Sequence, residues 1–467
     1  MDIGLIGLAT MGRNLALNML ERGVSVAGFD IDPDCRHRCT RDSRFASAAF
    51  SLHESLDAFI ATLNPPRLLI LLIKAGQPVD QILSQLIPKL NPGDVILDGG
   101  NSHFTDTIRR ARELSHHGIR FLGAGISGGA QGARHGPAIM LGGHPVPHAL
   151  EHLLQTISAR FDTHPCLVHL DGDGAGHFVK MIHNGIEYAD MQLLAESQFL
   201  LQHLIGLDYP GQAAVFNLWN QGALSSYLTA TTARILDKTD PETGLPALEI
   251  IHDEADHKGT GQWAAQIALE LGVSAPNIMQ AVDARLLSKM QPERHLLRQP
   301  WRSPILANTT AEEKEWMIPA LAGVLLAARI TAFAQGFKIF DAASQRFNWH
   351  LDKGAIAACW RRGCILQGIL PERIRQAYAT EPDLVHLLLD PVLGQHVAQG
   401  FDRGRNLLAF ALNRKLPVAG LITALSFFDA LRQHPLWTRI IAAQRDCFGA
   451  HGFVRSDRNQ RVSWDWS

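Results

Sequence analysis

The sequence predicts an α/β domain at the amino terminus, then a large all-α domain, then a short carboxyl-terminal tail. Residues 1–175 alternate short apolar runs with helical patterns, as parallel sheets with crossover helices do. From Gly176 onward the strand patterns stop, and apolar residues recur every three or four positions. After Gln444 the chain turns polar and charged, which is typical either of a disordered tail or of an arm that packs on a partner. We therefore expect domains at 1–175 and 176–440, with a tail at 441–467.

The α/β pattern is built from five expected strands and two clear crossover helices. Gly23 and the Asn91-Pro92-Gly93 turn mark where those helices stop. The expected strands are Ile3–Ile6, Val24–Phe29, Leu68–Leu72, Val95–Leu97 and Arg120–Gly123, and the helices are Met11–Arg22 and Asp80–Leu90.

Net charge, apolar stretches and cysteine spacing indicate which classes of protein this chain does not resemble. A net charge of -2 over 467 residues gives no basic field for nucleic acid or anionic membranes. The longest apolar stretch, Pro319–Ile330, contains Arg329 and is shorter than a membrane span of about 20 residues, so we expect a buried helix. Met1 leads directly into the first strand, and six irregularly spaced cysteines form no disulfide framework. We expect a cytoplasmic protein.

The first strand runs into a dinucleotide-binding fingerprint of the Rossmann-like type. Glycine at its first position permits a tight turn, alanine at the third lets backbone approach a pyrophosphate, and the last glycine allows close helix packing. Asp30 ends the next strand at about the expected twenty-residue distance. The fingerprint residues are Gly7, Leu8, Ala9, Thr10, Met11 and Gly12.

Asp30 also bears on which nicotinamide cofactor is used. A carboxylate at this strand end accepts hydrogen bonds from the ribose hydroxyls and repels a 2'-phosphate, which favours NAD. In the alternative, Asp30 and Asp32 are loop residues, and Arg36 or Arg38 meets the 2'-phosphate of NADP.

Two glycine-rich turns follow later strands of the expected sheet. Asp98–Ser102 and Gly125–Gly129 would border the ligand crevice at the carboxyl ends of the strands. Their backbone amides can approach a bound carboxylate, with Asn101 and Ser127 adding side-chain hydrogen bonds. Taken singly, each is equally compatible with an ordinary turn.

A polar helix face carries the strongest catalytic pattern. Five side chains at i, i+3, i+4, i+7 and i+8 share one face of a helix whose opposite face is apolar. A solvated surface is the alternative. Against it, Gly185 would weaken the helix unless another element packs closely there. The five residues are Lys180, His183, Asn184, Glu187 and Tyr188.

Other polar residues give weaker patterns. Cys35 and Cys39 flank His37, but no second ligand pair with zinc-like spacing follows, and we expect no metal. Scattered cations are surface residues unless they converge on an anion. The candidates for such convergence are Lys258, Arg285, Arg445 and His451.

Together these motifs resemble the decarboxylating 6-phosphogluconate dehydrogenases over nearly the whole chain. The resemblance lies in residues 7–17 (GLATMGRNLAL), 73–76 (IKAG), 96–102 (ILDGGNS), 127–129 (SGG), 132–134 (GAR), 176–188 (GHFVKMIHNGIEY), 258–261 and 444–451 (QRDCFGAH). It implies oxidation of 6-phosphogluconate and release of CO2 to give ribulose 5-phosphate, a step of the pentose phosphate pathway and of gluconate utilization. No metal is implied, because the ketone formed by oxidation serves as the electron sink.

The resemblance also assigns roles to residues. Lys180 would take the proton of the 3-hydroxyl and then stabilise the enolate, and Glu187 would protonate C1 of the enediol. Asn101, Ser127, Gly128, Gly129, His183 and Asn184 would hold the sugar acid. Tyr188, Lys258, Arg285, Arg445 and His451 would bind its phosphate, the last two from the tail of a partner subunit in a homodimer. The NAD or NADP cofactor would contact residues 7–12, Asp30, Ile31, Asp32, Ile73, Lys74, Ala75 and Asn101.

The chain departs from the family pattern at four places. Asp30-Ile31-Asp32 stands where Asn-Arg-Thr usually grips the 2'-phosphate of NADP. Ala130 and Gln131 replace a usual Glu-Glu, Leu141 replaces a proline, and Gln262 replaces a lysine.

Two other functions compete with this assignment. A 3-hydroxy acid dehydrogenase of the related short family would prefer unphosphorylated acids, and such enzymes lack the counterparts of Arg445 and His451. A catalytically silent paralogue would bind nucleotide without turnover, although the intact Lys180 and Glu187 oppose that interpretation.

Overall fold

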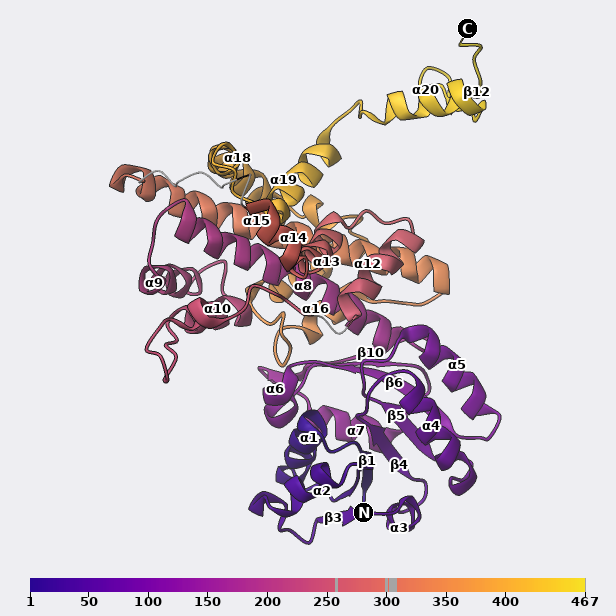
Figure 1. Cartoon of the computed structure of the whole chain (residues 1–467). Helices are drawn as coiled ribbons and strands as arrows, with labels where there is room; N and C mark the ends of the chain where they lie inside the picture. The colour runs from indigo at the N-terminus through magenta and orange to yellow at the C-terminus, as the bar shows by residue number, and fades with distance from the viewer. Residues whose placement is uncertain (257–258, 299–300, 302–308, 467) are drawn as a thin grey trace.

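The amino-terminal domain is a Rossmann-like, eight-stranded sheet (Figure 1). The computed structural model describes residues 1–256, 259–298, 301 and 309–466. Strand order is β10-β7-β6-β5-β4-β1-β2-β3, and every neighbouring pair is parallel except β6 and β7. The strands are β1 (Ile3–Ile6), β2 (Val26–Phe29), β3 (Phe50–His53), β4 (Leu68–Leu71), β5 (Val95–Asp98), β6 (Arg120–Ile126), β7 (Ile139–Gly142) and β10 (Leu167–Leu170).

Helices cover both faces of this sheet and bury two separate apolar cores. Side chains of α1, α2, α6 and α7 pack in one core, and those of α3, α4 and α5 pack in the other. The helices are α1 (Thr10–Glu21), α2 (Pro33–Thr40), α3 (Leu56–Ala61), α4 (Gln77–Leu86), α5 (Phe104–Ser115), α6 (Gly129–His135) and α7 (His148–Ile157).

All five expected strands are present, but three further strands of this sheet were missed. β3 (FSLH) and β10 (LVHL) carry polar residues within four positions, and β7 (IMLG) ends in glycine, so none of the three is a continuous run of β-branched and other apolar residues. β3 is an edge strand whose residues are all only partly buried, so it lacks the continuous apolar run of a central strand. The α/β class is confirmed.

The second domain is helical and is organised around two long helices that pack on each other. A Cβ at Gly336 of α15 would lie 2.4 Å from the Ile186 side chain of α8, so this glycine permits the close crossing. The helices are α8 (Ala175–His203), α9 (Tyr209–Trp219), α10 (Tyr227–Leu236), α11 (Ala247–Ile250), α12 (Thr260–Glu270), α13 (Pro276–Ser288), α14 (Gln291–Arg298), α15 (Ala311–Phe347), α16 (Lys353–Cys359), α17 (Ile369–Thr380), α18 (Pro391–Asn413) and α19 (Ala419–Arg432).

The apolar stretch at residues 319–330 lies inside α15, as expected for a buried helix. The whole helix has 37 residues and passes the length and composition test for a membrane span, yet 78% of its most apolar window is buried inside the protein. Its Arg329 donates a 2.9 Å hydrogen bond to buried Asp190, which neutralises the charge within the core. α15 is therefore a core helix of this domain.

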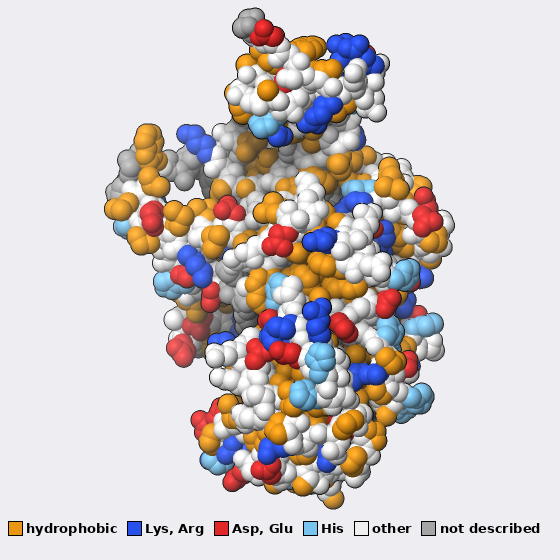
Figure 2. Space-filling model, turned by 90° about the vertical axis from the view of Figure 1, so that its right-hand side faces the viewer, with side chains coloured by type: hydrophobic (Ala, Val, Ile, Leu, Met, Phe, Trp, Pro, Cys, Tyr) orange, Lys and Arg blue, Asp and Glu red, His pale blue; other side chains and the backbone are white. Residues whose placement is uncertain are grey.

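The tail forms a small folded unit that extends away from the body of the chain (Figures 1 and 2). It consists of α20 (Thr438–Gly449) and a hairpin of β11 (Phe453–Val454) and β12 (Arg461–Val462). Buried Asp446 organises it by accepting hydrogen bonds from the amides of Gly452 and Trp464, at 2.8 and 2.9 Å, and from the Trp466 indole at 2.8 Å. The alternative of a disordered tail is therefore wrong.

Candidate active site

The amino-terminal half of α8 lies against the carboxyl end of β6, and small residues permit the contact. A Cβ at Gly125 of β6 would lie 2.2 Å from the Lys180 Cβ, and one at Gly176 would lie 2.4 Å from the Gly123 carbonyl oxygen. Because no larger residue fits at these positions, the helix backbone approaches the strand closely. This contact places Lys180 beside the turn that follows β6.

The polar face of α8 forms a chain of hydrogen bonds with its surroundings. Lys180 Nζ donates to Ser127 Oγ at 3.0 Å, and that hydroxyl lies 3.5 Å from His183 Nε2. The other ring nitrogen of His183 lies 3.2 Å from Asn184 Oδ1, and Asn184 Nδ2 donates to Thr260 Oγ1 at 2.9 Å. Four residues singled out from the sequence therefore meet, together with Thr260 of α12.

This face is buried, so the alternative of a solvated helix surface is wrong. Lys180 is 8% exposed and His183 is 0% exposed. The His183 ring packs edge-on against Trp360, with ring centroids 5.1 Å apart. A Cβ at Gly185 would lie 2.6 Å from the Ala264 Cβ of α12, which supplies the close packing that this glycine requires.

Burial shifts the ionisation of the three titratable groups on this face. Desolvation lowers the pKa of Lys180, although the charge of Glu187 and the thiol of Cys364 act in the opposite direction. Desolvation raises the pKa of Glu187, and Lys180 and Arg285 partly oppose that rise. The pKa of His183 lies well below its usual value because the ring is buried near the Lys180 cation. Burial thus shifts the amine and the carboxyl group each toward its uncharged form, the forms that act as base and acid.

Glu187 and Tyr188 continue the polar face one turn further along α8. A Glu187 oxygen lies 3.7 Å from His183 Nδ1. The Arg285 guanidinium of α13 lies over the Tyr188 ring, 3.4 Å from its centroid. This cation–π contact brings Arg285 to the end of the face, where a cation can meet an anionic group of a ligand.

Of the remaining predicted phosphate ligands, Arg445 and His451 do not lie at the Lys180 site of their own chain. Lys258 lies outside the described residues. Arg445 and His451 belong to the tail, which extends away from the domain that carries Lys180 (Figure 1).

The dinucleotide fingerprint has the geometry that its glycines indicate. Gly7 has a φ of +100°, and a Cβ there would lie 2.4 Å from the Leu72 carbonyl oxygen. A Cβ at Gly12 would lie 1.8 Å from the Gly7 carbonyl oxygen. Ala9 caps α1 without a side-chain hydrogen bond, so the first amides of the helix stay available to an anion.

A cavity of about 430 Å³ adjoins this turn at the point where the strand order reverses between β1 and β4. Its wall combines the ends of β1, β2 and β4 with α4. The position and lining fit the adenosine half of a dinucleotide. The lining includes Gly7, Ala9, Asp30, Ile31, Asp32, Ile73 and Lys74.

Asp30 lines this pocket, and its carboxylate also binds the backbone around it. Its two carboxylate oxygens accept hydrogen bonds from the amides of Leu8 at 2.6 Å and Asp32 at 2.9 Å. Ile31 is 80% exposed and offers no charge. Arg36 donates to the carbonyl oxygens of residues 30 and 31, at 2.7 and 3.2 Å, so one cation does lie at this edge. Arg38 instead donates to the Cys35 thiol.

Arg110 of α5 was missed by sequence reasoning, although it connects the two loops that follow β4 and β5. Its side chain is 0% exposed and binds Asp80 through two hydrogen bonds of 2.8 and 3.0 Å. It also donates to the Gly76 carbonyl oxygen at 3.0 Å and lies 3.9 Å from Asp98. Asp98 in turn accepts a 2.6 Å hydrogen bond from Ser102, which fixes the loop that carries Asn101.

Comparison with known proteins agrees with this geometry. The family model described as the NAD binding domain of 6-phosphogluconate dehydrogenase matches residues 2–169. The model described as the 6-phosphogluconate dehydrogenase C-terminal domain matches residues 176–466.

Individual relatives match over the whole chain. The NADP(+)-dependent, decarboxylating 6-phosphogluconate dehydrogenase of Bacillus subtilis is 41% identical, over 100% of this chain and 99% of the relative. The decarboxylating 6-phosphogluconate dehydrogenase 1 of Saccharomyces cerevisiae is 40% identical, over 97% and 92%. The structure of Plasmodium falciparum 6-phosphogluconate dehydrogenase, described in apo form and with NADP+ or 6-phosphogluconate, superposes with a TM-score of 0.96 and 32% identity over 100% of both chains.

Proposed function

Because the chain belongs to the 6-phosphogluconate dehydrogenase family, we propose that it oxidises 6-phospho-D-gluconate with a nicotinamide cofactor and releases CO2 to give D-ribulose 5-phosphate. The observation that carries this proposal is the buried Lys180, held 3.0 Å from Ser127 on the same helix face as Glu187.

Lys180 acts first as a base. The neutral amine, favoured by its lowered pKa, accepts the proton of the substrate 3-hydroxyl. A bound nicotinamide would supply the acceptor for the hydride that leaves C3. Ser127 fixes the amine through their hydrogen bond, so the base approaches the hydroxyl in one orientation.

Lys180 and Glu187 then share the decarboxylation. The carboxylate carbon leaves as CO2, and its bonding electrons move toward the 3-keto oxygen, where protonated Lys180 stabilises the developing enolate. Glu187, whose pKa is raised by burial, delivers a proton in its acid form to the carbon that becomes C1. One substrate carbon is lost, and no metal enters any of these steps.

The other site residues bind and orient the substrate. The turn at Ser127, Gly128 and Gly129 and the loop at Asn101 receive the sugar acid together with His183 and Asn184. Tyr188, Lys258 and Arg285 receive its phosphate. We assign Arg445 and His451 to the phosphate site of a second copy in a homodimer, because the tail extends away from its own chain (Figure 1).

We propose that NAD is preferred over NADP. The Asp30 carboxylate lies in the cofactor cavity beside the uncharged side chain of Ile31, so a 2'-phosphate would meet a negative charge there. Arg36 is the residue that could oppose this preference. The double change Asp30→Asn with Ile31→Arg should move kcat/KM toward NADP, and a wild-type protein more efficient with NADP would refute the Asp30 argument.

We also place the reaction in the cytoplasm. All six cysteines are free thiols, and five of them are buried, which suits a reducing compartment.

The Lys180→Met variant tests the catalytic assignment. It should lose turnover with 6-phosphogluconate while NAD binding, followed by fluorescence titration, stays near wild type. Lys238→Met removes an exposed lysine of the same domain and should keep wild-type turnover. Substantial activity in Lys180→Met would refute the role of Lys180.

A further inference from the structure

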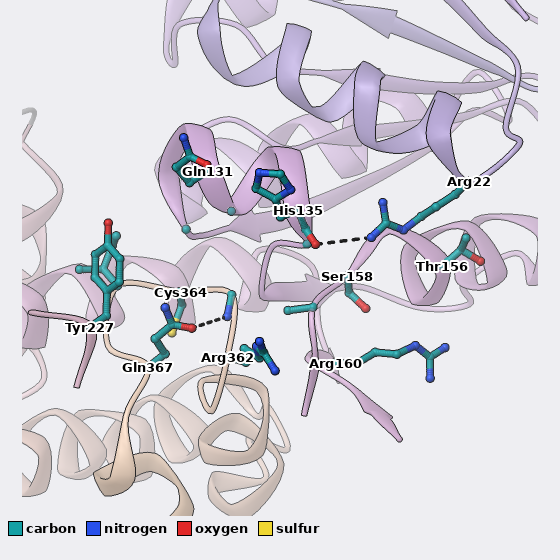
Figure 3. A pocket seen from close by; sticks show the side chains of 16 residues that line it. Arg22, Gln131, His135, Thr156, Ser158, Arg160, Tyr227, Arg362, Cys364 and Gln367 are labelled. Atoms are coloured by element: carbon teal, nitrogen blue, oxygen red, sulfur yellow. Dashed lines mark hydrogen bonds between the residues drawn. The ribbon is translucent and has the colours of Figure 1, made fainter. Parts of the chain in front are cut away.

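A second cavity, of about 440 Å³, lies behind the turn that we assign to the sugar acid (Figure 3). Figure 3 shows Gln131 and His135 of α6 on one side and Arg362, Cys364 and Gln367 of the facing loop on the other. Gly128 contributes to its wall, and a Cβ there would lie 2.4 Å from the Gly363 carbonyl oxygen. The cavity shares Gly128 with the turn beside Lys180, and Lys180 itself is not among its lining residues.

The charged side chains that line this cavity are all cationic. Arg22, Arg160 and Arg362 contribute to its lining with His135, and none of its lining residues is acidic. Arg22 donates to the carbonyl oxygens of Asn18 and His135, at 3.2 and 3.4 Å. Arg160 donates to the Thr163 carbonyl oxygen at 2.8 Å. Such bonds orient a guanidinium without neutralising its charge.

Carboxylates near this cavity already have other partners. Glu21, next to Arg22 in the chain, pairs with Arg134. Glu372 pairs with Arg361 and with Arg375, at 3.1 and 2.8 Å. In the described part of the chain, no ion pair includes Arg22, Arg160 or Arg362. Three exposed arginines therefore border one concavity, and none of them forms an ion pair within the part of the chain that the structure describes.

The uncharged lining also suits an anion. Gln131, Thr156, Ser158 and Tyr227 place amide and hydroxyl groups around the cavity. Its volume lies within the range of about 300–1,000 Å³ that is usual for small-molecule sites. Guanidinium groups bind phosphate through paired hydrogen bonds, and several of them suit an anion with more than one negative charge.

We propose that this cavity binds a small phosphorylated anion at a site separate from the catalytic groove. The ligand class is a phosphate ester or a pyrophosphate, whose charge the three arginines neutralise. This inference does not depend on the proposed reaction, because it rests on the cavity and its charges alone.

Calorimetric titration of the full-length protein with inorganic pyrophosphate tests the proposal. Saturating 6-phosphogluconate and reduced cofactor are present, so that the catalytic groove is occupied but no turnover takes place. We expect one pyrophosphate per chain. Arg160→Gln and Arg362→Gln should each weaken binding about ten-fold or more, because each removes charge-assisted hydrogen bonds. Gln131→Glu should abolish binding by placing a carboxylate in the cavity.

Matched controls lie on α18, away from this cavity. Arg403→Gln and Gln395→Glu change exposed residues in the same chemical way and should leave pyrophosphate binding unchanged. The proposal is overturned if pyrophosphate does not bind, if the cavity variants bind it as tightly as wild type, or if the α18 variants weaken binding equally. Because the readout is binding without turnover, a failed oxidation assay leaves this test intact.

Discussion

Gly125→Ala is a small substitution that should disable catalysis by moving Lys180. The added Cβ would lie 2.2 Å from the Lys180 Cβ and 2.9 Å from its Cγ. Carbon atoms in contact are normally about 3.5 Å or more apart, so α8 and β6 must separate by roughly 1 Å. The Lys180 amine, now 3.0 Å from Ser127 Oγ, would lose its alignment with that hydroxyl.

The expected magnitude follows from this displacement. A misplacement of about 1 Å at a catalytic group costs on the order of 100-fold in rate, so kcat should fall by about that factor. Overpacking should also lower the free energy of unfolding, by about 1–3 kcal/mol. Because domains are typically stable by about 5–15 kcal/mol, the variant should still fold.

Steady-state kinetics and urea denaturation separate the two effects. NAD binding should stay near wild type, because the fingerprint at the end of β1 does not contact Gly125. Gly222→Ala is the control, since the nearest atom to a Cβ at Gly222 lies 4.0 Å away, and it should change neither property. A folded Gly125→Ala protein with wild-type kcat would refute the proposed placement of Lys180.

Three further predictions test the electrostatics and the assembly. The first concerns the pH profile of kcat/KM, which rises with pH as Lys180 loses its proton. The negative charge of Glu187 raises the pKa of Lys180, so this rise should move to lower pH in Glu187→Gln. A rise at the wild-type pH would contradict this coupling. Arg110→Met should lower the free energy of unfolding by about 3–5 kcal/mol and raise the KM for the cofactor. The control is Arg109→Met, which removes an exposed arginine that also contacts Asp80 and should lower the free energy of unfolding by about 1 kcal/mol or less. Equal losses of the two variants in urea denaturation would contradict the role of Arg110. The third prediction mixes Lys180→Met subunits with Arg445→Ala subunits, which are unfolded and refolded together. About half of the dimers are then mixed and each has one intact site of two, so the mixture should regain about one quarter of wild-type activity. A mixture as inactive as its two parents would contradict a tail that crosses to the partner.

Local constraints on the chain explain which features the sequence revealed. Gly7 and Gly12 contact each other within one turn, so their spacing alone indicates the turn. The polar face of α8 follows from helical periodicity, and its five side chains do lie together or on adjacent turns. Both features depend on residues that are close in sequence.

Contacts between distant segments explain what was missed. Arg110 looks like any charged residue of an amphipathic helix until α4 and the β4 and β5 loops close around it. Thr260 contacts Asn184 of α8 although it lies 76 residues further along the chain. Trp360, which follows α16, contacts His183 of the same face. No local pattern marks such residues, because only the packing of separate helices gives them their partners.

The reaction itself is tested most directly by supplying 6-phosphogluconate with NAD or NADP and measuring reduced cofactor and CO2 in the same sample. We predict equal amounts of the two products from the wild-type protein, and neither product from Lys180→Met. Reduced cofactor without CO2, or faster oxidation of an unphosphorylated 3-hydroxy acid, would contradict the assignment of this site as an oxidative decarboxylase of 6-phosphogluconate.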